Sequence, residues 1–462
     1  MPSSTSRTEA ISLSSLRGEV TGRVIGPEDP GYDEARTVFI GGIDRRPAVI
    51  VRVADARDVA TVIRLARETG LELAVRSGGH SSIGHGVSEG GIVLDLSEMK
   101  AIDIDVEGRT AWAETGLTAA EYSVAVSAHG LATGFGDTGS VGIGGITLGG
   151  GVGYLVRKHG LTIDALLAAD IVTADGELLR VDAESHPDLF WAIRGGGGNF
   201  GVATRFHFRL NEVPSFVGGI LILPGTAEVV AGFVTAADAA PEELSTIANV
   251  MPCPPMPFVA EEHHGKLVVM AIMAFAGETD AGERALAPFR ALAAPIVDML
   301  KRMPYPEIYP PDSDDYHPLA LTRTMFVDTI GLPTAETIVE HLEASDAAMR
   351  VAQLRVLGGA MARVSADATA FAHRNSRIMV NVATFYEGPE DLDRRTAWVE
   401  GLAGALRQDD HGAYVNFLAD EGEERIRDAY PGATWDRLAE IKARYDPTNL
   451  FRLNQNIPPK AS

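Results

Sequence analysis

The first 210 residues alternate between strand-like and helix-like hydrophobic patterns. Residues 48–53 (AVIVRV) predict a buried strand, and residues 55–68 predict a helix that Asp55 caps and Gly70 stops. A second short strand is predicted at 73–76, so the three segments form a β-α-β unit. The unit leads into a loop, 77–86, made almost entirely of Gly, Ser and His.

The following segments continue this mixed pattern up to about residue 210. We predict a short strand at 92–94, an alternating segment at 101–106, a helix at 119–129 closed by Gly130, a hairpin over 171–181 that turns at Asp175-Gly176, and a half-buried strand at 202–210.

The pattern changes at Pro214, where glycine becomes rare and Ala- and Glu-rich helical segments alternate with apolar strands such as 267–274 and 378–384. The last fifty residues resemble the first part again in composition. We therefore expect an α+β fold with three segments: 1–214 and 411–462 form one domain, and 215–410 form a second domain between them.

Charge and composition narrow the class of partner. The chain has 40 Lys and Arg against 63 Asp and Glu, a net charge of -23, which would repel phosphate backbones and anionic lipids. We therefore expect no nucleic-acid or membrane partner. The polar N-terminus predicts no signal peptide, so a cytoplasmic protein is expected. A single cysteine, Cys253, excludes an internal disulfide, and the oligomeric state stays open.

Glycine gathers in three clusters, at 77–86, 134–153 and 195–198. Glycine lets backbone N–H groups approach phosphate or a flat ring without an intervening Cβ, so the clusters together predict a bound dinucleotide. Neutral N–H dipoles would also explain how an acidic chain holds pyrophosphate. The pattern G-x-G-x-x-G occurs at 134–139 and at 196–201, but neither copy stands between a strand and a helix, which argues against a Rossmann fold.

Four stretches carry a family resemblance, and they are Arg76-Ser-Gly-Gly-His80, 141–153 (VGIGGITLGGGVG), 191–201 (WAIRGGGGNFG) and 445–457. With them the chain resembles the FAD-linked oxidases of the vanillyl-alcohol-oxidase superfamily, in the berberine-bridge-enzyme-like branch. Residues 369–374 and 414–417 support the resemblance more weakly. It implies a two-domain PCMH-type FAD-binding fold, in which the antiparallel sheet of a substrate domain covers the flavin.

The resemblance also implies how FAD is held. His80 would bond covalently to the flavin 8α carbon, although an isolated Gly-His would be interpreted as an ordinary loop histidine. The loop backbone would cradle the pyrophosphate, the second glycine cluster the ribityl chain and ring, and Val202 the adenine. The implied cofactor-binding residues are Arg76, Ser77, Gly78, Gly79, His80, Ser81, Gly84, His85, Thr138, Val141, Gly142, Gly144, Gly145, Gly149, Gly150, Gly153, Val202, Asn454 and Asn456.

Two positions refine this expectation. Some members of the family hold the flavin by a second bond, from a cysteine at the position that is Thr138 here, so we expect a single covalent link. In the family, the residue before Gly142 controls the access of oxygen to the flavin. The small Val141 at this position favours an oxidase, although Val141 is equally interpretable as a core residue.

The chemistry requires a group that takes a proton from the substrate's O–H or N–H. The resemblance points to Tyr414 for this role, with Asn416 and Tyr154 completing the pocket. An unperturbed phenol titrates near ~10, so a lowered pKa would be required. Gln353 and Arg355 are weaker candidates, for which we favour a structural role, and His373-Arg374 is interpreted as a packed, hydrogen-bonded motif.

The expected activity is that of an FAD-dependent oxidase, which removes a hydride from a C–H next to O or N of a small organic substrate and reduces O2 to H2O2. Two alternatives stay open: a dehydrogenase with another electron acceptor, and a non-redox cyclase or lyase that uses the flavin as a scaffold. The acidic or His-rich segments 261–264 and 312–315 are interpreted as solvated loops, so no metal is expected. The substrate itself is not determined by these patterns.

Overall fold

The computed structural model describes residues 11–310 and 316–461. The polar N-terminal stretch and the acidic run 312–315 lie outside the described residues. A first, mainly parallel sheet has the strand order β1-β2-β4-β3 and is followed in the chain by a larger antiparallel sheet. The elements of the first part are α2 (Leu13–Glu19), β1 (Arg23–Ile25), α3 (Tyr32–Arg36), β2 (Val49–Arg52), α4 (Ala56–Thr69), β3 (Leu73–Arg76) and β4 (Ile92–Asp95).

The predicted β-α-β unit is confirmed. Strands β2 and β3 each pair in parallel with β4, and α4 connects them. The Asp55 side chain accepts hydrogen bonds from the backbone N–H groups of Arg57 and Asp58, and Gly70 ends the helix with φ of 64°. Since β3 ends at Arg76, the unit delivers the loop 77–86 to the carboxyl edge of this sheet.

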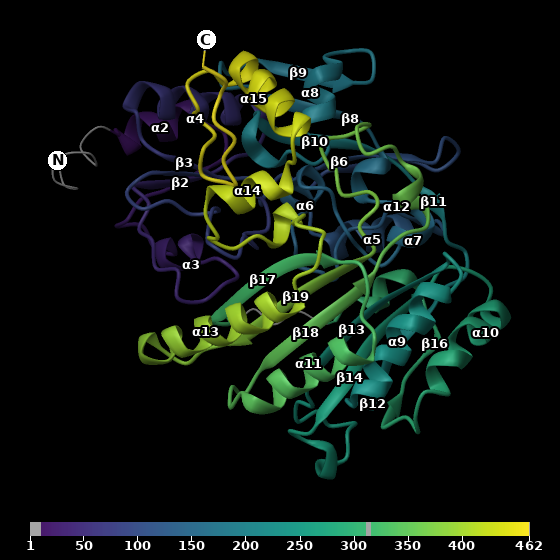
Figure 1. Cartoon of the computed structure of the whole chain (residues 1–462). Coiled ribbons are helices and arrows are strands. Elements are labelled where there is room, and N and C mark those ends of the chain that lie inside the picture. The colour runs from purple at the N-terminus through teal and green to yellow at the C-terminus, as the bar shows by residue number, and fades with distance from the viewer. Residues whose placement is uncertain (1–10, 311–315, 462) are drawn as a thin grey trace.

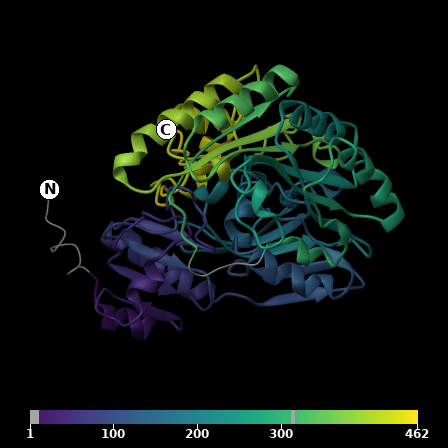
Figure 2. The same ribbon diagram turned by 90° about the horizontal axis from the view of Figure 1, so that it is seen from below.

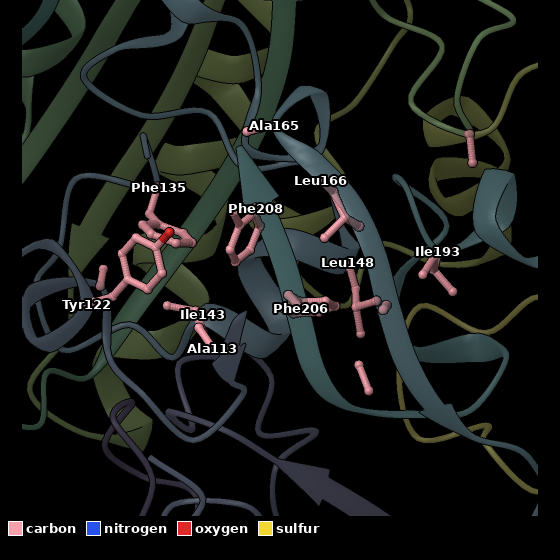
Figure 3. Close-up of a cluster of buried hydrophobic side chains, with 14 of the residues drawn as sticks. Ala113, Tyr122, Phe135, Ile143, Leu148, Ala165, Leu166, Ile193, Phe206 and Phe208 are labelled. Atoms are coloured by element: carbon pink, nitrogen blue, oxygen red, sulfur yellow. The ribbon is translucent and has the colours of Figure 1, made fainter. Parts of the chain in front are cut away.

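The second sheet has the order β5-β6-β10-β8-β9 and carries the main core of the N-terminal part. Phe208 of β10 packs beside Phe135 and Tyr122, and Phe206 packs against Phe208, as Figure 3 shows. The elements are β5 (Ile102–Asp105), β6 (Thr110–Glu114), α5 (Ala119–Ser127), β7 (Leu131–Ala132), α6 (Ile143–Leu148), α7 (Val156–His159), β8 (Leu166–Val172), β9 (Leu178–Asp182), α8 (Pro187–Ala192), β10 (Val202–Arg209) and β11 (Asn211–Glu212).

Helix α5 ends at Ser127, two residues earlier than expected, because the chain turns at Gly130 into β7, which pairs with β11. The hairpin at Asp175-Gly176 is confirmed, since β8 and β9 pair antiparallel across it. The third glycine cluster runs directly into β10, as the sequence predicted, and β10 pairs with β8 in antiparallel orientation. This order of strands is not that of a Rossmann fold.

A third, antiparallel sheet has the order β15-β12-β14-β13-β18-β19-β17, with β16 paired to β12. Helices α9, α11 and α13 pack against one face and bury its apolar side chains there (Figure 1). The elements are β12 (Val217–Pro224), α9 (Ala227–Ala239), β13 (Leu244–Pro252), β14 (Leu267–Phe275), α10 (Thr279–Arg290), β15 (Val297–Asp298), β16 (Lys301–Arg302), β17 (Ala320–Val327), α11 (Leu332–Ala344), β18 (Arg350–Val356), α12 (Ala360–Arg363), β19 (Ile378–Phe385) and α13 (Pro389–Leu406).

The C-terminal segment returns to the N-terminal part. Helices α14 (Glu423–Ala429) and α15 (Ala433–Tyr445) follow α13, and α15 contacts α8. Figure 1 shows these yellow elements beside the purple and blue ones, away from α9 and α11. On this arrangement we propose the domain division 1–214 with 411–462, and 215–410 between them.

Two arginines join the N-terminal part to the sheet region. Arg374, whose side chain is fully buried, donates to both carboxylate oxygens of Asp164 at 2.7 and 2.8 Å. Arg157 donates to the backbone oxygens of Ala237 and Ala240 at the end of α9. Figure 2 shows the two parts as adjoining layers, the purple and blue part below and the teal and green part above. These hydrogen bonds therefore hold the third sheet against the part of the chain that carries the glycine loops.

Candidate active site

A cavity of about 420 Å³ lies where the glycine loops, the C-terminal segment and the helix-free face of the third sheet meet. The loop after β3 and the loop before α6 form one side. The third glycine cluster and residues 451–455 form another. Thr322 of β17 and Asn381 of β19 contribute from the sheet, and residues 414–418 reach it from the segment that follows α13.

Most of the predicted cofactor residues line this cavity. They are Arg76, Ser77, Gly78, Gly79, His80, Ser81, His85, Thr138, Val141, Gly142, Gly144, Gly145, Val202 and Asn454, together with the predicted catalytic residues Tyr414 and Asn416. Segments separated by more than 300 residues in the chain are thus brought to one place, as the Ser82 hydroxyl shows by donating to the Leu418 carbonyl at 3.1 Å.

Six predicted site residues do not line the cavity: Gly84, Gly149, Gly150, Gly153, Asn456 and Tyr154. For three of these glycines the structure gives another reason for the missing side chain. A Cβ at Gly149 would overlap the Asn416 amide, one at Gly150 would lie 3.0 Å from the Phe371 ring, and one at Gly153 would overlap the Phe135 carbonyl. These glycines therefore allow close contacts within the protein, and they shape the site through Asn416 and its neighbours.

Tyr154 has a comparable indirect position. Its side chain is 1% exposed, its hydroxyl donates to the Asp137 carbonyl at 3.0 Å, and its ring packs edge-on against Tyr309. Burial raises the pKa of Tyr154 well above its usual range. A buried phenol that is already hydrogen-bonded supports the loop around Asp137 and is poorly placed to exchange a proton with a substrate.

The loop that carries His80 is held by buried polar contacts. The Arg76 guanidinium donates to Asp95 at 2.7 Å and to the Ala35 carbonyl at 2.6 Å, so its charge is used inside the protein. Gly79 has a φ of +70°, which a side chain would strain, and it allows the chain to turn before His80. The His80 ring stacks on Phe39, with ring centroids 4.1 Å apart and planes 18° apart. The stacking gives the half-buried imidazole a defined orientation at the cavity wall.

His85, at the other end of this loop, is neutral at physiological pH. Burial, with Arg45 adding to it, lowers the pKa of His85 to about 4. Arg45 in turn donates to three carbonyls of the loop, those of Ile83, Gly84 and Val87. The turn is therefore fixed by one cation, and His85 contributes an uncharged ring to the wall.

The Tyr414 hydroxyl oxygen lies at the meeting point of three hydrogen-bond donors. The backbone N–H groups of Gly151 and Val152 donate to it at 3.1 and 3.2 Å, and the Asn416 amide donates at 3.0 Å. Burial nevertheless raises the pKa of Tyr414, and the three donors oppose this rise. The lowered pKa that a basic role requires is therefore not a property of Tyr414 in the protein alone. Three donors do match a phenolate, because a neutral phenol oxygen offers only two lone pairs.

Asp137 is a functional candidate that the sequence analysis missed. Its carboxylate lines the cavity and receives the Arg355 guanidinium at 2.5 Å. Arg355 also binds Gln353, at 2.6 and 2.9 Å, and the Gln353 amide donates to Asn249 at 2.9 Å. Gln353 and Arg355 thus belong to a polar chain that ends at Asp137, and neither is among the residues that line the cavity, so a structural role stays the prediction for both.

Asn381 and Thr322 were also missed. Both lie on the helix-free face of the sheet, and the Asn381 side-chain oxygen is buried with no hydrogen-bond partner among the described residues. The strand 378–384 was predicted, and its alternation places Asn381 opposite the apolar positions Val380 and Val382 that pack under the helices. A polar residue in the middle of an apolar strand was the available signal.

The cavity can be tested for its fit to a dinucleotide. A Cβ at Gly145 or at Gly198, both of which line it, would meet nothing within 4 Å, so these backbones face open space. The Asn454 side-chain oxygen and the Tyr430 hydroxyl are buried at its wall without a partner among the described residues. Accessible backbone and unsatisfied polar atoms along one cavity fit a ligand such as FAD.

This fold and this cavity define a class, the two-domain PCMH-type FAD-dependent oxidoreductases of mixed α and β structure. The sequence pattern described as "FAD binding domain" matches residues 47–182, and the pattern "Berberine and berberine like" matches residues 413–458. The chain belongs to the berberine-bridge-enzyme-like branch of the vanillyl-alcohol-oxidase superfamily, as the following relatives show.

The chain is 31% identical over 456 residues to (R)-6-hydroxynicotine oxidase of Paenarthrobacter nicotinovorans, covering 96% of this chain and 98% of the relative. It is 31% identical over 450 residues to an uncharacterised FAD-linked oxidoreductase of Bacillus subtilis, with the same coverage. The crystal structure of 6-hydroxy-D-nicotine oxidase from Arthrobacter nicotinovorans matches with a TM-score of 0.85 and 28% identity, over 96% of this chain and 98% of that one.

No helix within 11–310 and 316–461 is long and apolar enough to cross a membrane. The same residues contain no group of three or more His, Cys, Asp or Glu side chains that could hold a metal ion. Segment 261–264 forms a short 3-10 turn with no buried side chain, in agreement with a solvated loop.

Proposed function

We propose that this FAD-dependent oxidoreductase is an oxidase that removes a hydride from a C–H next to O or N of a small organic substrate and passes the electrons to O2, forming H2O2. The observation that carries the proposal is the cavity itself. It joins the His80 loop to the Tyr414 and Asn416 side chains beneath a polar sheet face. FAD, when bound, supplies the two-electron acceptor.

The residues of the chain have distinct tasks in this proposal. The loop around His80, with Gly142, Gly144 and Gly145, would hold FAD, and His80 would form the single covalent link, Thr138 standing where a second attachment would need a cysteine. Stacking on Phe39 supports the link, because it orients the imidazole toward one position before bond formation.

Tyr414 would accept the proton that leaves the substrate's O–H or N–H. To do so Tyr414 must first be a phenolate, and the Gly151, Val152 and Asn416 donors would stabilise that phenolate, which becomes a neutral phenol once it has taken the proton. Asn416 keeps its orientation by also donating to the Ile146 carbonyl at 3.1 Å. The Arg355 charge also lowers the pKa of Tyr414 and would favour the same phenolate.

The substrate would meet acceptor atoms at the sheet end of the cavity. Asp137 and Asn381 both line it, the Asn381 amide oxygen has no partner among the described residues, and the Arg355 charge balances that of Asp137. Acceptors at this end select a substrate that carries a hydrogen-bond donor, a hydroxyl or an N–H, besides its reacting carbon.

Covalent attachment is tested by acid precipitation of the purified protein. Flavin absorbance that stays in the pellet for the wild type, and moves to the supernatant for His80→Ala, supports the link. Flavin in the wild-type supernatant contradicts it. His85→Ala is the matched control, because it alters a neighbouring imidazole and should leave the flavin in the pellet.

The choice between oxidase and dehydrogenase is tested by stopped-flow reoxidation of the reduced enzyme with O2. Val141 lines the cavity, and its small side chain would leave room for O2. We expect fast reoxidation in the wild type and a reduced rate in Val141→Ile. Slow reoxidation of the wild type would favour a dehydrogenase with another acceptor, and a substrate that never bleaches the flavin would favour the non-redox alternative.

A further inference from the structure

Lys442 is a buried cation outside the cavity that contacts two of its walls. It lies in α15, and both its side chain and that of Asp446 are 0% exposed. The ammonium donates three hydrogen bonds, to Asp446 at 2.6 Å, to the Asn199 carbonyl at 2.7 Å and to the Phe451 carbonyl at 2.9 Å. All three donors of the lysine are therefore used.

Asp446 extends this arrangement toward the C-terminus. One carboxylate oxygen accepts from the Leu450 N–H at 2.8 Å, and the other accepts from the Phe451 N–H at 2.9 Å as well as from Lys442. The carboxylate thus fixes the turn that starts the segment 451–455. Four residues of that segment line the cavity: Phe451, Leu453, Asn454 and Gln455.

Asn199 extends the hydrogen-bond network of Lys442 toward the third glycine cluster. Its amide oxygen accepts from the Ile457 N–H at 3.0 Å, and its amide nitrogen donates to Gly196 at 2.9 Å and to Gln455 at 3.1 Å. Gly197, Gly198 and Asn199 line the cavity from this side. One ammonium group therefore connects two cavity walls that are far apart in the chain. Lys442 itself is 243 residues from Asn199.

We propose that Lys442 is a positioning residue for FAD: with Asp446 and Asn199 it holds the third glycine cluster and the C-terminal segment at the spacing that the cofactor requires. A purely structural ion pair is the alternative. A buried ion pair gives little net stability compared with apolar side chains of similar size, so stability alone does not explain the Lys442–Asp446 pair. The position of this pair behind both cavity walls favours the positioning role. The inference depends on FAD binding, which the family establishes, and not on the substrate or on the His80 link.

The test measures FAD affinity in a protein that binds the cofactor reversibly. In His80→Ala, where the proposed covalent link cannot form, the FAD dissociation constant is measured by ultrafiltration over a concentration series. Lys442→Met and the milder Lys442→Gln are added to this background, and only monodisperse protein with a wild-type circular dichroism spectrum is used. The matched control is Glu440→Gln on the same helix, which removes an exposed ion pair with Lys460.

We expect each Lys442 variant to weaken FAD binding by about tenfold or more and to change the flavin absorbance bands, and we expect no effect of Glu440→Gln. A dissociation constant within about twofold of the control, even with a lowered unfolding midpoint, would make Lys442 merely structural and overturn the proposal.

A second measurement needs no Lys442 variant. Hydrogen–deuterium exchange of the His80→Ala protein is compared with and without FAD. The proposal expects FAD to slow exchange at the amides of Leu450, Phe451 and Ile457, which donate to Asp446 and Asn199. Unchanged exchange at all three amides would overturn it, because the network would then be insensitive to the cofactor.

Discussion

Asp137, in the loop before α6, and Arg355, on β18 of the third sheet, form an ion pair of 2.5 Å across the boundary between the two parts of the molecule. The Arg355 side chain is 4% exposed and the Asp137 side chain 24%, so the carboxylate faces the cavity while the guanidinium lies behind it. The pair couples the position of the sheet to the wall of the site. It also presents a charge-balanced acceptor to whatever the cavity binds.

Replacing Asp137 should change substrate binding more than cofactor binding. Asp137→Asn leaves a neutral acceptor and an uncompensated Arg355. We expect KM to rise by about tenfold or more, because a buried charge–hydrogen-bond partner is worth ~1.5–3 kcal/mol. Steady-state kinetics and flavin absorbance measure the two effects. Arg363→Met, which breaks an exposed pair with Glu242, is the control, and loss of flavin from Asp137→Asn would instead assign Asp137 to the cofactor.

Tyr414→Phe removes the phenol oxygen and keeps the ring. We expect kcat to fall by ~10²–10⁴-fold, the range for a lost general base, with the flavin still bound. The variant should also unfold more easily, since three N–H donors lose their acceptor. Flavin reduction by substrate in single-turnover experiments measures the chemical step, and an unchanged rate would remove Tyr414 from the mechanism.

Two glycine variants should separate cofactor contacts from protein contacts. Gly145→Ala adds a methyl group that meets no protein atom within 4 Å, and within α6 alanine favours the helix. We expect an unchanged or raised unfolding midpoint together with reduced FAD content. Gly153→Ala would overlap the Phe135 carbonyl, so we expect little folded protein. Equal FAD content in Gly145→Ala and the wild type would contradict our assignment of Gly145 to the cofactor.

Arg374 and Arg377 lie three residues apart and offer a matched pair for stability. Arg374→Met leaves Asp164 without its buried bidentate partner, and we expect a loss of ~3–5 kcal/mol in the free energy of unfolding. Arg377 forms an exposed pair with Asp238, with both side chains more than half exposed, so Arg377→Met should cost no more than ~1 kcal/mol. Denaturant unfolding measures both values, and similar losses would show that Arg374 does not join the two parts.

Stability should fall between about pH 6.5 and pH 4 through His85. The pKa of His85 is about 4 in the folded protein, against 6.5 for an exposed imidazole, so within this window the unfolded chain binds a proton that the folded protein does not. The slope for one such group is at most ~1.4 kcal/mol per pH unit. His159, whose pKa burial also lowers to about 4, adds a second contribution. The free energy of unfolding should depend less steeply on pH across this range in His85→Gln than in the wild type. An identical slope in the two proteins would show that His85 is accessible to protons.

The local motifs were sufficient to predict the glycine loops that line the cavity, because a glycine-rich turn that follows a strand is encoded within a few consecutive residues. The β-α-β unit, its cap at Asp55 and its stop at Gly70 follow from propensities that operate within one or two turns of helix. The ordered series of glycine clusters, with His80 in the first, also identified the family before any tertiary contact was known.

Only the tertiary structure decided which residues meet. Tyr414 binds the Gly151 amide 263 residues away, Asp137 binds Arg355 218 residues away, and Gly149 is glycine because Asn416 occupies the space of its side chain. A sequence states which side chains exist and which face of a strand they occupy. The partner of a buried polar group depends on how the sheets and loops pack, because desolvation makes that pairing favourable only where the fold brings the two groups together.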